Sequence, residues 1–321
     1  MRQTPVLILA YNRADNVRGL IELLRQYRPA TVMVVVDGPK PGNTADEERV
    51  QAVRDAVSTI DWTESLQTRF RPVNVGLRRS VADAVTWATS EYGQVIVIED
   101  DVRPGPAFIP YLEAMLERYR DDERIMHVSG YNVVPPSELA GGPTDSRLTI
   151  YPESAAWATW DRAWAHYDDQ LAWASRASSR ELTEKTGRFT AGLRWRQNFD
   201  DAAAGRISSW AYRWLASMWA VGGLTLSPNV NLIEYVGHED GTHTLMKPAW
   251  KDLPVYTGPV APLLEPSPEL DPTADAWVNR VVFSGTPFGV VRGVAITAAL
   301  ATRKRYREAS AAGASRSEHR A

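Results

Sequence analysis

Cysteine is absent from this chain of 321 residues, and its absence removes several kinds of protein from consideration. Without thiols the chain has no disulfide framework, no thiolate metal site and no cysteine nucleophile. It also has no surplus of positive charge, because its formal net charge is −3 at pH 7. That balance argues against a general nucleic-acid-binding protein. The lack of cysteine suits a reducing cytoplasm.

Targeting segments and common nucleotide-binding motifs are missing too. The first apolar run starts at about residue 4, with no basic stretch and no long apolar stretch before it, so we expect no signal peptide and no N-terminal anchor. The sequence contains no P-loop, no Gly-x-Gly-x-x-Gly motif, no zinc-ligand spacing, no serine elbow and no internal repeat. Function therefore has to be sought in the order of strands, helices and acidic residues.

Apolar runs alternate with amphipathic segments through the first hundred residues. We expect strands at about 4–10, 31–36, 68–72 and 95–98, and helices at about 14–27, 50–60 and 80–92. Continuous apolar strands joined by helices indicate a mostly parallel sheet covered on both faces. In such a sheet, ligands bind beyond the carboxyl ends of the strands.

Three acids follow the last of these strands and form the most informative motif of the chain. Glu99, Asp100 and Asp101 come directly after the run 95–98. A hard cation such as Mg²⁺ or Mn²⁺ takes carboxylate oxygens and keeps water and substrate phosphates as its other ligands. The alternative is that Asp100 or Asp101 caps a helix that begins near Pro106.

Four segments, in this order, carry a resemblance to a known family. They are Ala10-Tyr11-Asn12-Arg13, Val36-Asp37-Gly38, Asn74-Val75-Gly76-Leu77 and Val97-Ile98-Glu99-Asp100-Asp101. Together they resemble the nucleotide-sugar half of GT-A glycosyltransferases of the N-acetylglucosaminyltransferase I type and its bacterial relatives. The resemblance implies a GT-A fold: a Rossmann-like mixed, mostly parallel sheet with helices on both faces, and a helical, tryptophan-rich acceptor half.

The resemblance also implies roles for the matching residues. Asp37 would accept a hydrogen bond from a base N–H or a ribose hydroxyl, and Asp101 would bind the metal. A guanidinium at Arg78 or Arg79 would neutralise a diphosphate; the alternative there is a solvated helix start, where the helix dipole disfavours cations. The expected donor-binding set is Ala10, Asn12, Arg13, Asp37, Asn74, Gly76, Arg79, Glu99, Asp100 and Trp157.

Tryptophan is frequent in the second half, which is less regular. Residues 148–165 pass from a strand through small residues into a helix, and they resemble the loop that GT-A enzymes place beside the donor sugar. We expect Trp157 to stack on that sugar and most of the 12 tryptophans to pack in the core. A polar helical region at about 180–204 is either an acceptor-facing element or a solvated helix, with Asp200 and Asp201 on its exposed face.

The catalytic base is the main departure from the family pattern. Related inverting enzymes carry a carboxylate in or near the segment 208–214, and Ala211 stands in its place. Because alanine cannot take a proton, another acid must serve, or the chain is catalytically impaired, or the mechanism is retaining. We predict that Asp201 or Glu153 is the carboxylate that takes the proton. Asp161 and Asp200 are the other available carboxylates.

A late histidine completes the implied site. His243 matches a residue that returns to the metal and diphosphate in GT-A enzymes, with His238 as the alternative, and a surface loop histidine is the plain reading of both. An imidazole among carboxylates suits Mn²⁺ better than Mg²⁺.

The chain divides by composition into four parts. We expect a nucleotide-sugar half at 1–132, an acceptor and catalytic half at 133–246, a proline-rich connector at 247–287 and an amphipathic, basic segment with a disordered tail at 288–321. The last part either lies on an anionic membrane or docks on its own domain. These alternatives predict a cytoplasmic protein, free or peripheral at the inner face of the membrane.

These observations predict a metal-dependent glycosyltransferase. It would move a sugar from a UDP- or GDP-sugar to a hydroxyl of a glycan, a lipid-linked acceptor or a small molecule, in bacterial glycan or natural-product glycoside assembly, with Mn²⁺ or Mg²⁺. Two alternatives stay open: a nucleotidyltransferase, although residues 12–15 do not form its loop rich in glycine and in lysine or arginine, and a binding protein that has lost its base.

Overall fold

The computed structural model describes residues 4–236, 253–264 and 268–293. The chain forms two compact units. The larger unit comprises Met1–Asp169 and Ser209–Asp275, and the smaller comprises Gln170–Ser208 and Ala276–Ala321. His243 and His238 both lie outside the described residues, as does most of the predicted basic C-terminal segment.

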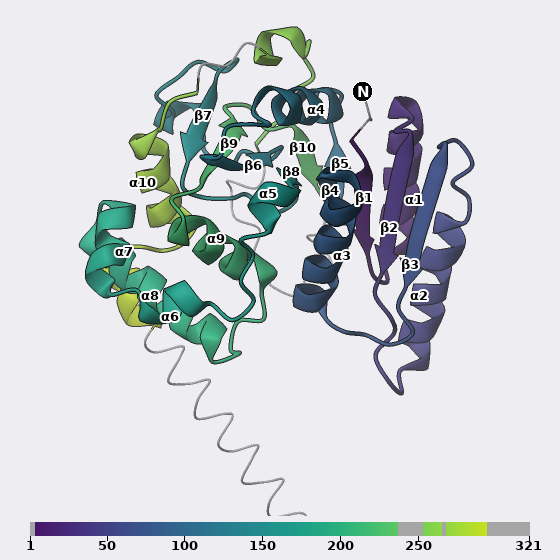
Figure 1. Cartoon of the computed structure of the whole chain (residues 1–321), viewed down its shortest axis with the longest axis horizontal. Coiled ribbons are helices and arrows are strands. Elements are labelled where there is room, and N and C mark those ends of the chain that lie inside the picture. The colour runs from purple at the N-terminus through teal and green to yellow at the C-terminus, as the bar shows by residue number, and fades with distance from the viewer. Residues whose placement is uncertain (1–3, 237–252, 265–267, 294–321) are drawn as a thin grey trace, which may run out of the picture. The chain divides into compact units, whose positions relative to one another are not determined.

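An eight-stranded mixed sheet is the frame of the larger unit (Figure 1). Its strand order is β3-β2-β1-β4-β8-β6-β9-β7. The strands are β1 (Val6–Ala10), β2 (Thr31–Val36), β3 (Ser65–Phe70), β4 (Gln94–Glu99), β6 (Ile125–Ser129), β7 (Ser146–Thr149), β8 (Ala156–Trp160) and β9 (Leu224–Pro228). Two further strands, β5 (Val102–Pro104) and β10 (Ile233–Tyr235), form a separate short antiparallel pair. The predicted mixed, mostly parallel sheet is confirmed, and it is consistent with a GT-A fold.

Helices cover both faces of this sheet. Two helices, α1 (Ala14–Tyr27) and α2 (Thr44–Val57), pack side by side, and α3 (Leu77–Tyr92) lies on the opposite face against β1 and β4 (Figure 1). The others in this unit are α4 (Phe108–Arg118), α5 (Asp161–Trp164), α9 (Trp210–Ala220) and the 3₁₀ turns Pro136–Glu138 and Ala261–Leu264. Every residue of β1 is buried, which explains its uninterrupted apolar sequence.

Strand direction brings the polar segments to one edge. Strands β1, β2 and β4 run parallel, so residues 11–13, 37–38 and 99–101 leave the sheet on the same side. Strand β8 runs antiparallel to β4, with Ala156 opposite Ile98. The loop that precedes β8 therefore arrives at the edge that carries the acids.

The smaller unit is helical. Its helices are α6 (Ala172–Arg176), α7 (Ser179–Thr186) and α8 (Phe189–Ala203), and the segment from Ala276 includes the last turns of α10 (Pro272–Val281). Trp195 packs against Phe199 and Phe283, and its Nε1 donates to Asn279 Oδ1 over 3.1 Å. In the described parts of the chain, no helix has both the length and the apolar character needed to cross a membrane.

Several local predictions need correction. The helix expected at 50–60 begins six residues earlier, at Thr44, because Asn43 caps it by accepting from Asp46 N. The helical region expected at 180–204 is two helices, α7 and α8, separated by Gly187 in a left-handed conformation. A regular helix, α10, lies where an extended proline-rich connector was predicted, and Pro272 stands in its first turn, where proline is tolerated.

Candidate active site

Two adjacent carboxylates and one guanidinium form the centre of the carboxyl edge. Asp100 and Asp101 follow β4 and are each 8% exposed. Arg13, which follows β1, places Nη1 at 3.3 Å from Asp100 Oδ1 and 3.6 Å from Asp101 Oδ2. Asp100 also accepts a hydrogen bond from Tyr11 N over 3.2 Å. The expected meeting of Arg13 with the acids is present, and neither acid caps a helix, because β5 follows them directly.

The environment of Glu99 and Asp100 favours their protonated forms. Burial raises the pKa of Glu99 well above its ordinary value, and the charges of Asp101 and Asp100 raise it further. Burial also raises the pKa of Asp100, to about 6, against the opposing effect of Arg13. Three acids and only one arginine lie together at this edge, so an additional cation would lower the pKa values of Glu99 and Asp100.

Asp101 has a free oxygen at this edge. Its Oδ1 is buried and has no hydrogen-bond partner among the described residues. Its other contacts hold it in place: Tyr235 of β10 hydrogen-bonds to the side chain, and Val236 N donates to the Asp101 backbone oxygen over 2.8 Å. Tyr235 is a site residue that the sequence analysis missed, since only the pairing of β10 with β5 brings it here.

An orphaned carboxylate oxygen fits a divalent cation. A buried acceptor without a partner is costly, and a metal ion would satisfy it. No group of three or more histidine or acidic side chains suited to a metal occurs in the described ranges, 4–236, 253–264 and 268–293. The residues therefore fit a cation held by one protein carboxylate, and water and substrate phosphates would have to supply its other ligands.

Asp37 is committed to the loop that follows β3. Its Oδ1 accepts from Gly38 N and Val75 N over 2.9 and 3.0 Å, and its Oδ2 accepts from Gly76 N over 3.1 Å. Asn74 Nδ2 donates to Gly38 O over 3.0 Å. A carboxylate has about four acceptor positions, so one position of Asp37 stays open for a ligand. The expected residues Asp37, Asn74 and Gly76 thus meet through a shared hydrogen-bond network.

Asn12 is tied to an acid that the sequence analysis missed. Asp46, buried in the first turn of α2, accepts from Asn12 Nδ2 over 2.7 Å, from Lys40 N over 2.8 Å and from the Tyr11 hydroxyl. Burial alone would raise the pKa of Asp46, but these hydrogen bonds outweigh burial and hold it below its ordinary value. Asp46 therefore fixes the segment that follows Ala10, the last residue of β1.

The start of α3 points toward the same edge and carries cations. Gly76 caps the helix with φ of +82°, a conformation that favours glycine. Arg79 is exposed and lies 3.6 Å from Asp83, whereas Arg78 is half-buried with Nε at 3.7 Å from Asp169 Oδ1. Arg213 of α9 approaches the same Asp169 oxygen to 3.3 Å. Of the two candidates, Arg78 is better placed for a diphosphate, because it shares a single carboxylate with a second arginine.

Trp157 does not have the expected role. It is fully buried, and its ring stacks on His127 at 4.8 Å and on Trp210 at 5.2 Å between ring centroids. Trp164 and Trp214 complete the cluster. The prediction of sugar stacking is wrong for this residue, because β8 directs the side chain into the packing between the sheet and α9 and leaves no face for a ligand.

The two predicted catalytic acids have different surroundings. Asp201 belongs to α8 of the smaller unit, and it is buried with its carboxylate 2.6 Å from Arg206 Nε, so the prediction that it lies on an exposed face is wrong. Glu153 belongs to the larger unit and lies half-buried in the loop before β8. Burial raises the pKa of Glu153 to about 7, although Arg147 opposes the shift. Ala211 stands in the first turn of α9, as expected.

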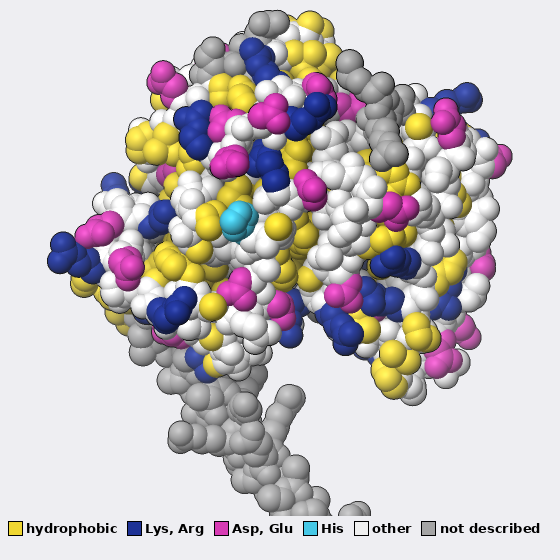
Figure 2. All heavy atoms as spheres, in the orientation of Figure 1, with side chains coloured by type: hydrophobic (Ala, Val, Ile, Leu, Met, Phe, Trp, Pro, Cys, Tyr) yellow, Lys and Arg dark blue, Asp and Glu magenta, His cyan; other side chains and the backbone are white. Residues whose placement is uncertain are grey.

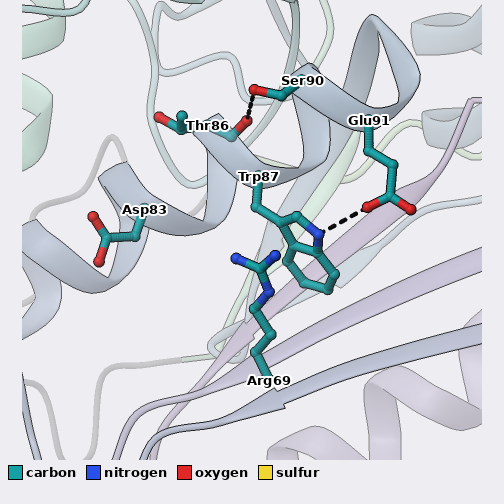
Figure 3. Close-up of a pocket in the computed structure, with 6 residues that line it drawn as sticks. All are labelled: Arg69, Asp83, Thr86, Trp87, Ser90 and Glu91. Carbon is teal, nitrogen blue, oxygen red and sulfur yellow. Dashed lines mark hydrogen bonds between the residues drawn. The ribbon is translucent and has the colours of Figure 1, made fainter.

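A separate surface pocket of about 430 Å³ takes no part in this arrangement (Figure 3). It lies along α3 and is lined by Arg69, Asp83, Thr86, Trp87, Ser90 and Glu91. The Arg69 guanidinium covers Trp87 at 3.7 Å from the ring centroid, and the Trp87 N–H donates to Glu91 over 2.8 Å. Arg69 therefore already covers one face of the Trp87 ring, and Glu91 already accepts from its only hydrogen-bond donor.

Comparison with known proteins finds one family that is similar to the part of the chain that carries this edge. No curated protein matches the sequence. The model of the GNT-I family matches residues 1–138, which is less than half of the chain but includes β1 to β6 and all the acids of the edge. This similarity to the GNT-I family over residues 1–138 supports a glycosyltransferase.

Proposed function

We propose that this protein transfers a sugar from a UDP- or GDP-sugar to an acceptor hydroxyl, with Mn²⁺ or Mg²⁺ as cofactor. The observation that carries the proposal is the buried, unpartnered Oδ1 of Asp101, just after β4 and within the residues that match the GNT-I family. A bound cation would offset the negative charge that develops on the leaving diphosphate. The acceptor would be a glycan, a lipid-linked sugar or a small molecule, in glycan or natural-product glycoside assembly.

The chain's own residues supply the remaining tasks. Asp101 would hold the cation, and the open acceptor position of Asp37 would bind a base N–H or a ribose hydroxyl. Arg78 and the start of α3 would bind diphosphate oxygens, since a helix N-terminus and a guanidinium both favour anions. Asn74 and Gly76 would keep the Asp37 loop in shape for that contact.

Calorimetry with UDP and GDP, each with and without Mn²⁺, tests the proposal. The wild-type protein should bind one of the two more tightly with the metal, and Asp101→Asn should lose the metal-dependent part of that affinity. Asp122→Asn is the matched control, because Asp122 is an acid paired with Arg124 outside the site. Equal metal-dependent affinity in Asp101→Asn and the control would refute the metal assignment.

A nucleotide-sugar-binding protein without catalysis is the second candidate, and Ala211 favours it. An alanine at the position where the resemblance predicts the base removes one route for the acceptor proton. Release of nucleoside diphosphate from a bound UDP- or GDP-sugar separates the two candidates. Tight donor binding with no release, with any acceptor, would identify a binding protein.

We also propose peripheral contact of the smaller unit with an anionic membrane, at the inner face in a cell. Phe288, Val291 and Phe189 are 76%, 68% and 64% exposed. Thr190 donates to Gly285 O over 2.9 Å, so the segments that bear these side chains lie side by side. Arg188 and Arg292 are exposed next to them in sequence. Exposed phenylalanines flanked by arginines suit the boundary between lipid headgroups and acyl chains.

On the face drawn in Figure 2, acidic and basic side chains are otherwise interspersed. This mixture fits the formal net charge of −3 and gives no broad area of one sign on that face. A partner attracted by general electrostatics is therefore not part of the proposal.

A further inference from the structure

The loop between β7 and β8 runs beside the acids of β4. Ala155 is the residue before β8, and its backbone oxygen lies 3.5 Å from Glu99 N. Glu153 stands two residues earlier in the same loop. Because β8 is antiparallel to β4, this loop belongs to the edge at which a donor would lie.

The Glu153 carboxylate has no direct polar partner among the described residues. It is half-buried, and no described residue donates a hydrogen bond to it or forms an ion pair with it. The charged groups that act on it are Arg147 of β7 and Asp275 of α10. Arg147 directs its two terminal nitrogens elsewhere: Nη1 donates to Pro228 O and Asn229 Oδ1, and Nη2 donates to Asn132 Oδ1, over 2.9–3.1 Å. Burial without a partner gives Glu153 a pKa of about 7, which suits a general base at neutral pH.

The backbone of Glu153 is held by a buried histidine. His127 Nε2 lies 3.1 Å from Glu153 O, and Trp214 Nε1 lies 3.2 Å from His127 Nδ1. An indole N–H only donates, so Nδ1 must accept and Nε2 must carry the proton that goes to Glu153 O. Burial lowers the pKa of His127 to about 3, which keeps the ring neutral. Stacking on Trp157 fixes the ring plane.

We propose that Glu153 accepts the proton of the acceptor hydroxyl, in place of the carboxylate that Ala211 lacks, and that His127 and Trp214 hold Glu153 in position. This inference rests on the proposed glycosyl transfer. The acceptor O–H bond breaks and its proton passes to the Glu153 carboxylate, while the acceptor oxygen bonds to the anomeric carbon. The bond from that carbon to the diphosphate breaks, and the diphosphate leaves with the electron pair. Glu153 then returns the proton to water.

Glu153→Gln tests the catalytic part, because it removes the base and keeps the shape of the side chain. The assay is release of nucleoside diphosphate from the UDP- or GDP-sugar that the wild type turns over best, with Mn²⁺, from pH 5 to pH 9. We expect kcat to fall about 10²- to 10⁴-fold, with donor affinity unchanged by calorimetry. Log kcat/KM of the wild type should rise with pH to a plateau above about 7, and this rise should vanish in the variant.

Glu113→Gln is the matched control. Glu113 is also half-buried with a pKa raised by burial, but it lies on α4. The Glu113→Gln variant should turn over the donor at the wild-type rate and with the wild-type pH profile. A kcat in Glu153→Gln equal to that of this control would overturn the assignment of Glu153.

His127→Phe tests the positioning part, because it keeps an aromatic ring against Trp157 and removes the hydrogen bond to Glu153. We expect kcat to fall about tenfold with donor affinity unchanged, and the rise of log kcat/KM to move to a different pH, which a purely structural role would not produce. An unchanged pH profile would overturn the role of His127. If the wild type neither binds nor cleaves any donor, the glycosyl transfer itself is wrong and this inference falls with it; failure of the variants alone leaves the proposed function standing.

Discussion

Arg13 Nη1 lies 3.6 Å from Asp101 Oδ2, the carboxylate whose other oxygen is buried without a partner. The guanidinium therefore supplies part of the positive charge that the acids need, but it reaches only one side of Asp101. A cation at the opposite oxygen and Arg13 would share this carboxylate. The two positive charges also repel each other, which makes Arg13 a means of adjusting metal affinity.

The first prediction follows from that repulsion. Arg13→Gln should bind Mn²⁺ alone about three- to tenfold more tightly than the wild type at pH 8, well above the pKa of about 6 that Asp100 has in the wild type. Calorimetry with the metal in the absence of nucleotide measures this. Weaker binding of Mn²⁺ in the variant would mean that Arg13 organises the acids rather than competing with the ion.

A second prediction concerns Asp37, which accepts from three backbone amides. In Asp37→Asn, an amide nitrogen would replace one of the accepting oxygens and face an N–H. We expect a loss of about 1–3 kcal/mol in the free energy of unfolding, and weaker binding of nucleoside diphosphate both with and without metal. Urea denaturation and calorimetry give the two quantities. A loss confined to the metal-dependent part of binding would contradict this role.

A third prediction concerns stability and pH at Glu153. Its folded pKa of about 7 exceeds the ordinary value of 4.5, so the native state binds this proton more tightly than the unfolded chain. The contribution of this proton to the free energy of unfolding is complete below about pH 4.5, and it is lost as the pH rises to 7. Asp100 and Asp275, with pKa values raised to about 6, act in the same direction at lower pH.

Glu153→Gln removes this loss, because glutamine does not ionise. The variant should therefore be more stable than the wild type at pH 8, by about 1–3 kcal/mol after allowance for partial exposure, and the difference should shrink at pH 5. Urea denaturation at the two pH values measures it. A difference that does not change between pH 5 and pH 8 would show that Glu153 has an ordinary pKa.

The fourth prediction separates packing from sugar binding at Trp157. Trp157→Ala should lower the free energy of unfolding by about 3–5 kcal/mol, because it opens a cavity among His127, Trp210 and Trp214. Trp157→Phe should cost less, since a ring remains. Thermal unfolding of both variants tests the order. A stable Trp157→Ala protein with weakened donor binding would restore the sugar-stacking role.

The sequence predicted the sheet edge well because its signals are local. An apolar run followed by Asp37, or by Glu99 to Asp101, indicates both a parallel strand and the edge at which it ends. Trp157 was mispredicted because the alternation of side chains along β8 does not reveal which face of the sheet α9 covers. Tyr235 and Asp46 were missed because each reaches the site through a contact far away in sequence, one through strand pairing and the other through packing of α2.

The last prediction concerns the exposed side chains of the smaller unit. Wild-type protein should sediment with vesicles of phosphatidylcholine and phosphatidylserine but not with phosphatidylcholine alone, and salt should weaken the binding. In Phe189→Ser/Phe288→Ser, two rings that would enter the lipid boundary are lost, so affinity should fall about tenfold or more. Phe70→Ser is the control, because Phe70 is 39% exposed on β3 of the larger unit. Equal binding of the double variant and the control would rule out this surface, and binding to phosphatidylcholine alone would rule out the role of the arginines.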